Sequence, residues 1–151
     1  MGRRPLWIQS GVAALAIAGA AGLLIASQRR ATDRTELKIA ASDLHTSAAE
    51  ARLLVQEHRG GRLPPRYWSS HLAMLRDQVR DEQASLDSAR ARPGLEAALA
   101  DTRALARDLS AAAEALAAGA DNATLSRAEA ELDGLARRLD DLVERLERMS
   151  A

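Results

Sequence analysis

The sequence contains no cysteine and no phenylalanine, and aromatic residues make up only 2% of its 151 residues. The lack of cysteine excludes disulfides, thiolate metal ligands and cysteine nucleophiles. A core so poor in aromatic side chains buries little area per residue, which suits close-packed helices better than a β-sandwich. The 21 basic and 21 acidic residues leave no net charge. Since a nucleic-acid-binding protein usually carries a basic patch, we expect no nucleic-acid partner.

Sequence motifs of catalysis are missing as well. The chain has no Gly-x-Ser-x-Gly, phosphate-binding loop or dinucleotide-binding fingerprint. Its three histidines show no metal-ligand spacing, and no Glu-x-x-His occurs, which removes the signature of a di-iron helical bundle. We therefore expect no enzyme activity, no catalytic or cofactor-binding residue, no cofactor and no metal.

The longest apolar stretch lies near the N-terminus, at residues 6–27, and reads LWIQSGVAALAIAGAAGLLIAS. A helix of this length rises about 33 Å, enough to cross a hydrocarbon core of about 30 Å. Arginine pairs bracket the stretch and a tryptophan lies where an interfacial anchor is expected. The pattern predicts a short basic tail at 1–5 and a transmembrane helix at 6–27, which includes Leu6, Trp7, Gly11, Gly22 and Ser27.

The apolar run is longer than the hydrophobic region of a cleaved signal peptide, which favours a signal-anchor. We expect a single-pass protein of a bacterial inner (cytoplasmic) membrane, bound to the lipid bilayer through this helix. The flanking charges are nearly balanced, and the short MGRR tail resembles an export signal, so we expect the C-terminal domain outside the cytoplasm; the opposite orientation is the alternative. A row of small residues spaced by four could support a homodimer through helix–helix association: Ser10, Ala14, Ala18, Gly22 and Ala26.

Residues 28–151 contain four stretches in which apolar residues recur at alternating spacings of three and four, the period of an amphipathic helix. The expected helices span approximately 28–59, 64–91, 93–118 and 122–149, and glycine and proline separate them. The first helix is expected to continue directly from the membrane helix, because no breaker follows Ser27. Short connections predict an all-α, antiparallel, up-down-up-down four-helix bundle. The last stretch has the heptad pattern of a coiled coil.

Folding the chain about its turn signals aligns the apolar stripes of neighbouring helices. In the first pair this alignment places Leu44 opposite Val79, and in the second it places Leu75 opposite Leu109. The connections at Gly60-Gly61 and Gly119 then lie together at the tip of the bundle.

Two groups of residues stand out as candidate sites. Arg66, Tyr67 and Trp68 form the aromatic cluster outside the anchor, at the bundle tip, and are of the types favoured at interaction hot spots. The alternative is that Trp68, which falls on an apolar stripe, belongs to the core. Glu82 is a carboxylate on an apolar stripe and is aligned with Thr102, which predicts a polar layer in the core. The alternative is that Glu82 reaches solvent.

These observations favour a membrane-anchored helical bundle that acts as a non-enzymatic structural or protein-interaction module, with a protein partner at its tip. The alternative is an extracytoplasmic, sensor-type ligand-binding bundle that works through a separate transducer. That alternative rests on an analogy of fold alone.

Overall fold

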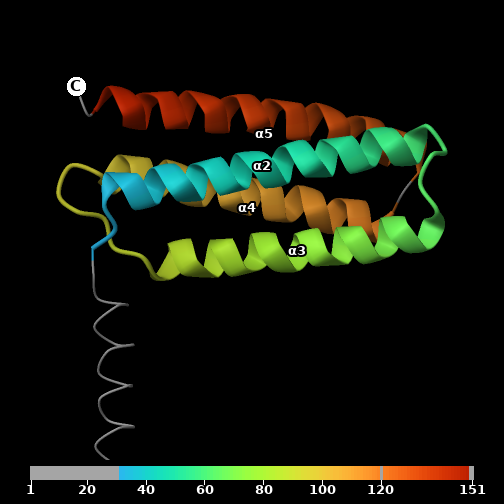
Figure 1. Cartoon of the computed structure of the whole chain (residues 1–151), viewed down its shortest axis with the longest axis horizontal. Helices are drawn as coiled ribbons and strands as arrows, with labels where there is room; N and C mark the ends of the chain where they lie inside the picture. Colours follow the sequence, from blue (N-terminus) through green and yellow to red (C-terminus); the bar gives the residue numbers. More distant parts are fainter. Residues whose placement is uncertain (1–30, 120, 150–151) are drawn as a thin grey trace, which may run out of the picture. The chain divides into compact units, whose positions relative to one another are not determined.

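The computed structural model describes residues 31–119 and 121–149, and this part of the chain forms four α-helices (Figure 1). They are α2 (Arg34–Arg59), α3 (Pro65–Ser88), α4 (Glu96–Ala118) and α5 (Asn122–Arg148). The same ranges contain no strand, only one isolated bridge between Thr32 and Ala91. The expected all-helical architecture with four helices is confirmed.

Successive helices run in opposite directions, and α5 returns alongside α2 (Figure 1). Ion pairs follow the seam between α2 and α5 in antiparallel order: Lys38–Glu147, His45–Asp140, Arg52–Asp133 and Arg59–Glu129. Helix α2 packs much more extensively against α5 than against α3, its neighbour in the sequence. The bundle is therefore closed tightly on the α5 side of α2 and more loosely on the α3 side.

Leucine and alanine supply nearly all of the buried apolar side chains in the described ranges, with Trp68, Val55 and Val79 as the exceptions. Two polar residues, Ser47 and Thr102, are buried as well. The Thr102 hydroxyl donates to the carbonyl of Ala98 in its own helix, 2.7 Å away, so its burial leaves no unpaired donor. The core confirms the composition argument, because small and aliphatic side chains let the four helices pack closely.

The start of α2 corrects one expectation. The helix was expected to run on from residue 28, but residues 31–33 are not helical and Asp33 is the N-cap. The Asp33 side chain accepts from the amide of Glu36, and the Glu36 side chain accepts from the amide of Asp33, which makes a capping box. Thr32 is also hydrogen-bonded through its backbone to Arg90 and Arg92 in the α3–α4 connection. These bonds favour an extended backbone over another helical turn.

The register between helices agrees with the sequence alignment for α2 and α3 but not for α3 and α4. Between α2 and α3, the contacts Glu50–His71 and Ser47–Gln78 fall where the alignment of Leu44 with Val79 places them.

Between α3 and α4, the ion pairs Arg80–Glu114 and Arg107–Asp87 lie several residues beyond the alignment of Leu75 with Leu109. The connection is not a tight turn about Arg92. Ala89 is extended, and the residues that follow pair with Thr32 before α4 begins.

The predicted basic tail, the transmembrane helix at 6–27 and the row of small residues on it lie outside the described residues. Within residues 31–119 and 121–149, no helix combines the length and the apolar character needed to cross a membrane.

Candidate interaction face between α2 and α3

Trp68 lies in the core and not in an exposed site. Its side chain is only 8% exposed, and its ring stacks on the ring of His58 from α2, with centroids 4.2 Å apart. This position agrees with the interpretation that Trp68 belongs to the core, which its place on the apolar stripe favoured. It therefore offers no surface to a partner in this structure.

Tyr67 is exposed, and its ring lies against a residue of its own helix that contacts α2. Its side chain is 48% exposed and its ring stacks on His71, with centroids 5.0 Å apart. His71 in turn places its Nε2 atom 2.6 Å from a carboxylate oxygen of Glu50 on α2. Arg66 is exposed as well but lies one residue earlier, about 100° away around the helix. The three residues predicted as one site thus divide among the core, the side facing α2 and the outer surface.

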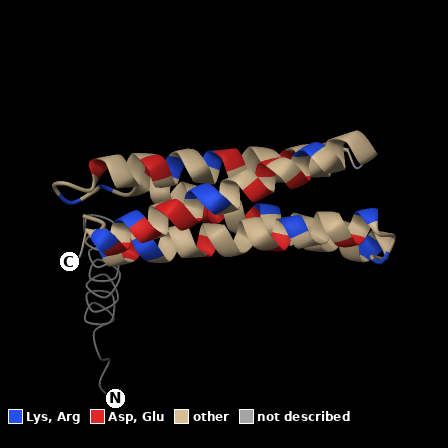
Figure 2. Cartoon of the chain, turned by 90° about the horizontal axis from the view of Figure 1, so that it is seen from above, with Lys and Arg blue, Asp and Glu red and all other residues tan. Residues whose placement is uncertain are grey.

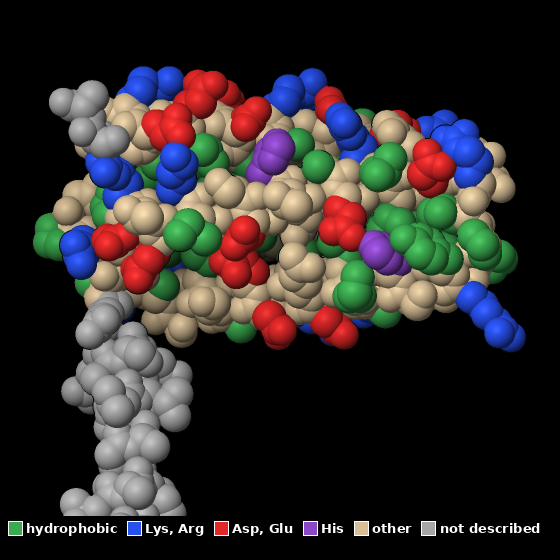
Figure 3. Space-filling view, viewed as in Figure 1, with side chains coloured by type: hydrophobic (Ala, Val, Ile, Leu, Met, Phe, Trp, Pro, Cys, Tyr) green, Lys and Arg blue, Asp and Glu red, His purple; other side chains and the backbone are tan. Residues whose placement is uncertain are grey.

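Exposed apolar residues lie on the two helix stripes that carry the His71–Glu50 contact. The large hydrophobic side chains that are exposed in the described ranges are Ile39, Leu53, Tyr67, Met74 and Met149. Helical spacing places the first two on the stripe of α2 that carries Glu50, and the next two on the stripe of α3 that carries His71. Hydrophobic side chains gather around one histidine near the end of the bundle where α2 joins α3 (Figure 3).

We call this surface the α2–α3 face. It consists of Ile39, Asp43, Glu50 and Leu53 from α2, with Tyr67, His71, Met74, Gln78 and Glu82 from α3. Sequence reasoning found Tyr67 and Glu82 but missed the others. The signal that could have found them is the recurrence of Ile39 and Leu53, and of Tyr67 and Met74, at multiples of seven beside the core stripes.

Charges elsewhere on the bundle are mixed, and acidic and basic residues alternate along the helices (Figure 2). The α2–α3 face differs because its members include carboxylates but no lysine or arginine. Five cations of these two helices pair with acids on other helices. On α2, Lys38, Arg52 and Arg59 pair with acids of α5, and on α3, Arg76 and Arg80 both pair with Glu114 of α4.

Glu82 is partly buried on this face, where Asp43 is its acidic neighbour. Burial raises the pKa of the Glu82 carboxyl, and the charge of Asp43 raises it further. Among residues 31–119 and 121–149, neither carboxylate takes part in an ion pair. The acidic charge of this pair is therefore uncompensated within the described part of the chain.

The structure shows no hydrogen bond between Glu82 and Thr102, its expected neighbour in a polar layer, and Arg103 and Arg138 of the neighbouring helices have other partners. The Thr102 hydroxyl donates to the carbonyl of Ala98. Arg103 donates to the carbonyls of Leu86 and Ala89 at the end of α3, and Arg138 pairs with Asp108. Glu82 thus takes part in the α2–α3 face, while Thr102 lies in the core.

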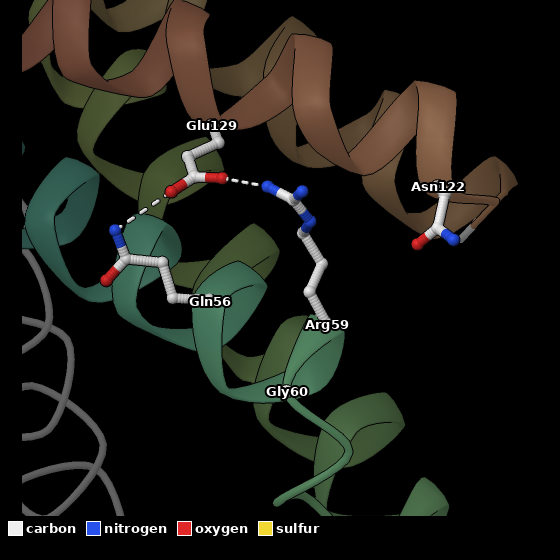
Figure 4. A pocket seen from close by; sticks show the side chains of 5 residues that line it. All are labelled: Gln56, Arg59, Gly60, Asn122 and Glu129. Carbon is white, nitrogen blue, oxygen red and sulfur yellow. Dashed lines mark hydrogen bonds and ion pairs between the residues drawn. The ribbon is translucent and has the colours of Figure 1, made fainter.

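A second candidate, a polar hollow at the bundle tip, is lined by Gln56, Arg59, Gly60, Asn122 and Glu129 (Figure 4). The Glu129 carboxylate accepts from the Gln56 amide at 2.9 Å and also from Arg59. The Gln56 hydrogen bond, followed by that of Arg59, holds the pKa of the Glu129 carboxyl below its usual range. Because Glu129 is already bound by Gln56 and Arg59, the hollow joins α2 to α5 and its carboxylate is occupied by groups of the chain itself.

The described residues contain no group of three histidine or acidic side chains placed to hold a metal ion. No protein-family model matches the chain, and no curated protein and no solved structure shows significant similarity to it. The α2–α3 face is therefore the feature from which a function can be inferred.

Proposed function

We propose that this protein is a membrane-anchored, non-enzymatic interaction module that presents the α2–α3 face to a protein partner. The observation that carries the proposal is the placement of exposed apolar side chains. Of the five large hydrophobic residues that are exposed in the described ranges, all except Met149 belong to this face. Single exposed apolar residues are ordinary on a protein surface, but their concentration on one face is typical of a binding site.

The residue types on the face also suit a protein partner. Tyrosine and methionine are enriched at protein interfaces. The Tyr67 ring is held in place by stacking on His71, which is itself fixed by Glu50. A side chain that is already ordered loses less conformational entropy when a partner binds. Leu53 and Met74 flank this ordered pair on the two helices, so the face combines a rigid centre with apolar sides.

The anchor completes the proposal. We assign residues 6–27 to a single span of a bacterial inner membrane, with the bundle outside the cytoplasm. Tethering confines the face to the neighbourhood of the bilayer, where a membrane-associated partner would meet it at a raised effective concentration. This assignment rests on the length and apolar character of the N-terminal stretch.

The test is co-purification of the tagged full-length chain from gently solubilised membranes, read by quantitative mass spectrometry. We expect a defined partner with the wild type and its loss with Leu53→Ser or Met74→Ser. Met149→Ser is the matched control, since Met149 is 54% exposed but is the C-cap residue of α5, away from the face. If the Met149 variant loses the partner and the Leu53 and Met74 variants retain it, the proposed face is wrong.

A further inference from the structure

Charge of one sign distinguishes the α2–α3 face from the other seams of the bundle. The seam between α2 and α5 is neutralised by four ion pairs, and Arg76 and Arg80 bring cations to the α3–α4 seam. On the α2–α3 face, Glu50 is occupied by His71, but the Asp43–Glu82 pair has no cation in the described ranges. An acidic partner would add to this repulsion, whereas a basic one would relieve it.

The order of residues along the face gives the shape of a complementary partner. Along α2 the face runs from Ile39 through Asp43 and Glu50 to Leu53, so two acidic positions lie between two apolar ones at intervals of one or two helical turns. The distance from Ile39 to Leu53 corresponds to a helical rise of about 21 Å. On α3, Tyr67 and Met74 lie toward the tip and Glu82 lies toward the other end. The face is a strip, and a rod-shaped partner would cover it.

From this strip we infer that the partner presents a cationic amphipathic helix, which lies along α2 and α3. Its apolar residues cover Leu53, Tyr67 and Met74, and its lysines or arginines pair with Asp43 and Glu82. The inference deepens the proposed function and depends on it. Helix-on-helix recognition of this kind is read through anchors spaced by three, four and seven residues. It would add a fifth helix to the bundle on the side where its own helices pack least closely.

Partial burial makes Glu82 the position most sensitive to the partner's charge. A carboxylate that is partly removed from water and faces another carboxylate gains most from a cation brought beside it. The gain would appear only in the complex. For this reason we expect replacement of the two acids to weaken binding of a cationic partner without harming the free bundle.

The probe for the experiment is a synthetic, hydrocarbon-stapled helix with leucine at heptad positions a and d and lysine at positions e and g. A second probe carries glutamine in place of every lysine. Binding of each labelled peptide is measured by fluorescence anisotropy with the full-length chain in nanodiscs of neutral phosphatidylcholine. Empty nanodiscs give the signal of peptide bound to lipid, which is subtracted.

Two double variants with the same change of charge separate a specific face from general attraction. Asp43→Asn/Glu82→Gln removes both acids from the face. Glu131→Gln/Asp141→Asn removes two exposed acids from α5, away from it. We expect the first double variant to weaken binding of the lysine peptide about tenfold and the second by about twofold or less. Leu53→Ser should also weaken binding, and thermal melts confirm that each variant is folded.

Three results would overturn the inference. Equal weakening by the two double variants would mean attraction to overall charge, and equal binding of the glutamine peptide would mean that cations are not recognised. If the chain itself dimerises and Leu53→Ser makes it monomeric, the occupant of the face is a second copy. If these results appear while the natural partner is still lost with Leu53→Ser, the proposed function stands and only the chemistry of the partner is wrong.

Discussion

At the scale of single residues, the raised pKa of Glu82 leads to a specific prediction about stability. Its pKa is raised above the ordinary value of 4.5, so the folded chain binds the proton more tightly than the unfolded chain. Stability is then highest below the ordinary value and falls as the pH rises through it toward the raised pKa. The ionised carboxylate therefore destabilises the bundle at neutral pH.

We expect Glu82→Gln to raise the free energy of unfolding at pH 7 by about 0.5 kcal/mol, a modest value because the group is partly solvated. The gain should vanish at a pH below the ordinary carboxyl value, where the wild-type group is also uncharged. Urea unfolding at both pH values measures it. A variant that is less stable than wild type at pH 7 would mean that the carboxylate is stabilised by a partner.

Arg103 has a role that the sequence did not reveal. Its Nε atom donates to the carbonyl of Leu86 at 2.9 Å, and its Nη2 atom donates to the carbonyl of Ala89 at 2.6 Å. Leu86 lies in the last turn of α3, where its carbonyl also accepts from the amide of the C-cap residue Ala89, and the carbonyl of Ala89 lies just beyond the helix. An arginine of α4 thus caps α3 and fastens the two helices at the place where their connection begins.

We expect Arg103→Ala to lower the free energy of unfolding by about 1–2 kcal/mol, because it removes charge-assisted hydrogen bonds to carbonyls. Arg107→Ala is the control. Arg107 pairs with Asp87 at 3.5 Å on the surface, and its loss should cost about 0.5 kcal/mol or less. Similar losses for the two variants in urea unfolding would contradict the capping role.

At the scale of helices, the first turn of α2 depends on its N-terminal capping box. The capping box of Asp33 and Glu36 fixes where the helix begins, and Arg92 lies 3.9 Å from the other Asp33 oxygen. We expect Asp33→Ala to destabilise the bundle by about 1 kcal/mol, and Asp33→Ser to restore most of that loss. Amide hydrogen exchange should show faster opening of the first turn of α2 in the alanine variant. Unchanged exchange there would mean that the bridge through Thr32 alone holds this end.

The helices themselves could be predicted because each has an apolar stripe and each connection between them contains glycine or proline. The register between α3 and α4 could not be predicted. Heptad stripes match one another at several alignments, so the connection decides among them, and the pairing of Thr32 with the segment around Ala91 has no signature in the sequence. The α2 start was missed for a related reason: Asp33 followed by Glu36 has the spacing of a capping box, but no glycine or proline separates it from the apolar run that ends at Ser27.

The candidate site was predictable only in part. Tyr67 stood out as an aromatic residue at a helix start, but exposed leucine and methionine residues are common and carry no signal alone. They became a face only when the structure placed α2 beside α3, with five cations of the two helices paired to acids of α4 and α5. Glu82 stood out as a carboxylate on an apolar stripe, yet its neighbour Asp43 could be identified only from the packing.

At the scale of the whole molecule, the proposal predicts one topology. A reporter enzyme that is active only after export, fused after Ala151, should be active, and the fusion should stay in the membrane pellet after extraction at alkaline pH. A fluorescent protein that matures only in the cytoplasm gives the complementary measurement. Fluorescence of that fusion would reverse the proposed orientation, and release of the chain by alkali would remove the anchor.

The central claim is that the α2–α3 face is where the partner binds, and photo-crosslinking in intact cells tests it most directly. A diazirine amino acid is placed in turn at Ile39, Leu53 and Met74, and at the control positions Ala111, Glu131 and Asp141 on α4 and α5. We predict one discrete crosslinked product from the three positions on the face and none from the controls. The same product from the controls, with none from the face, would contradict the account.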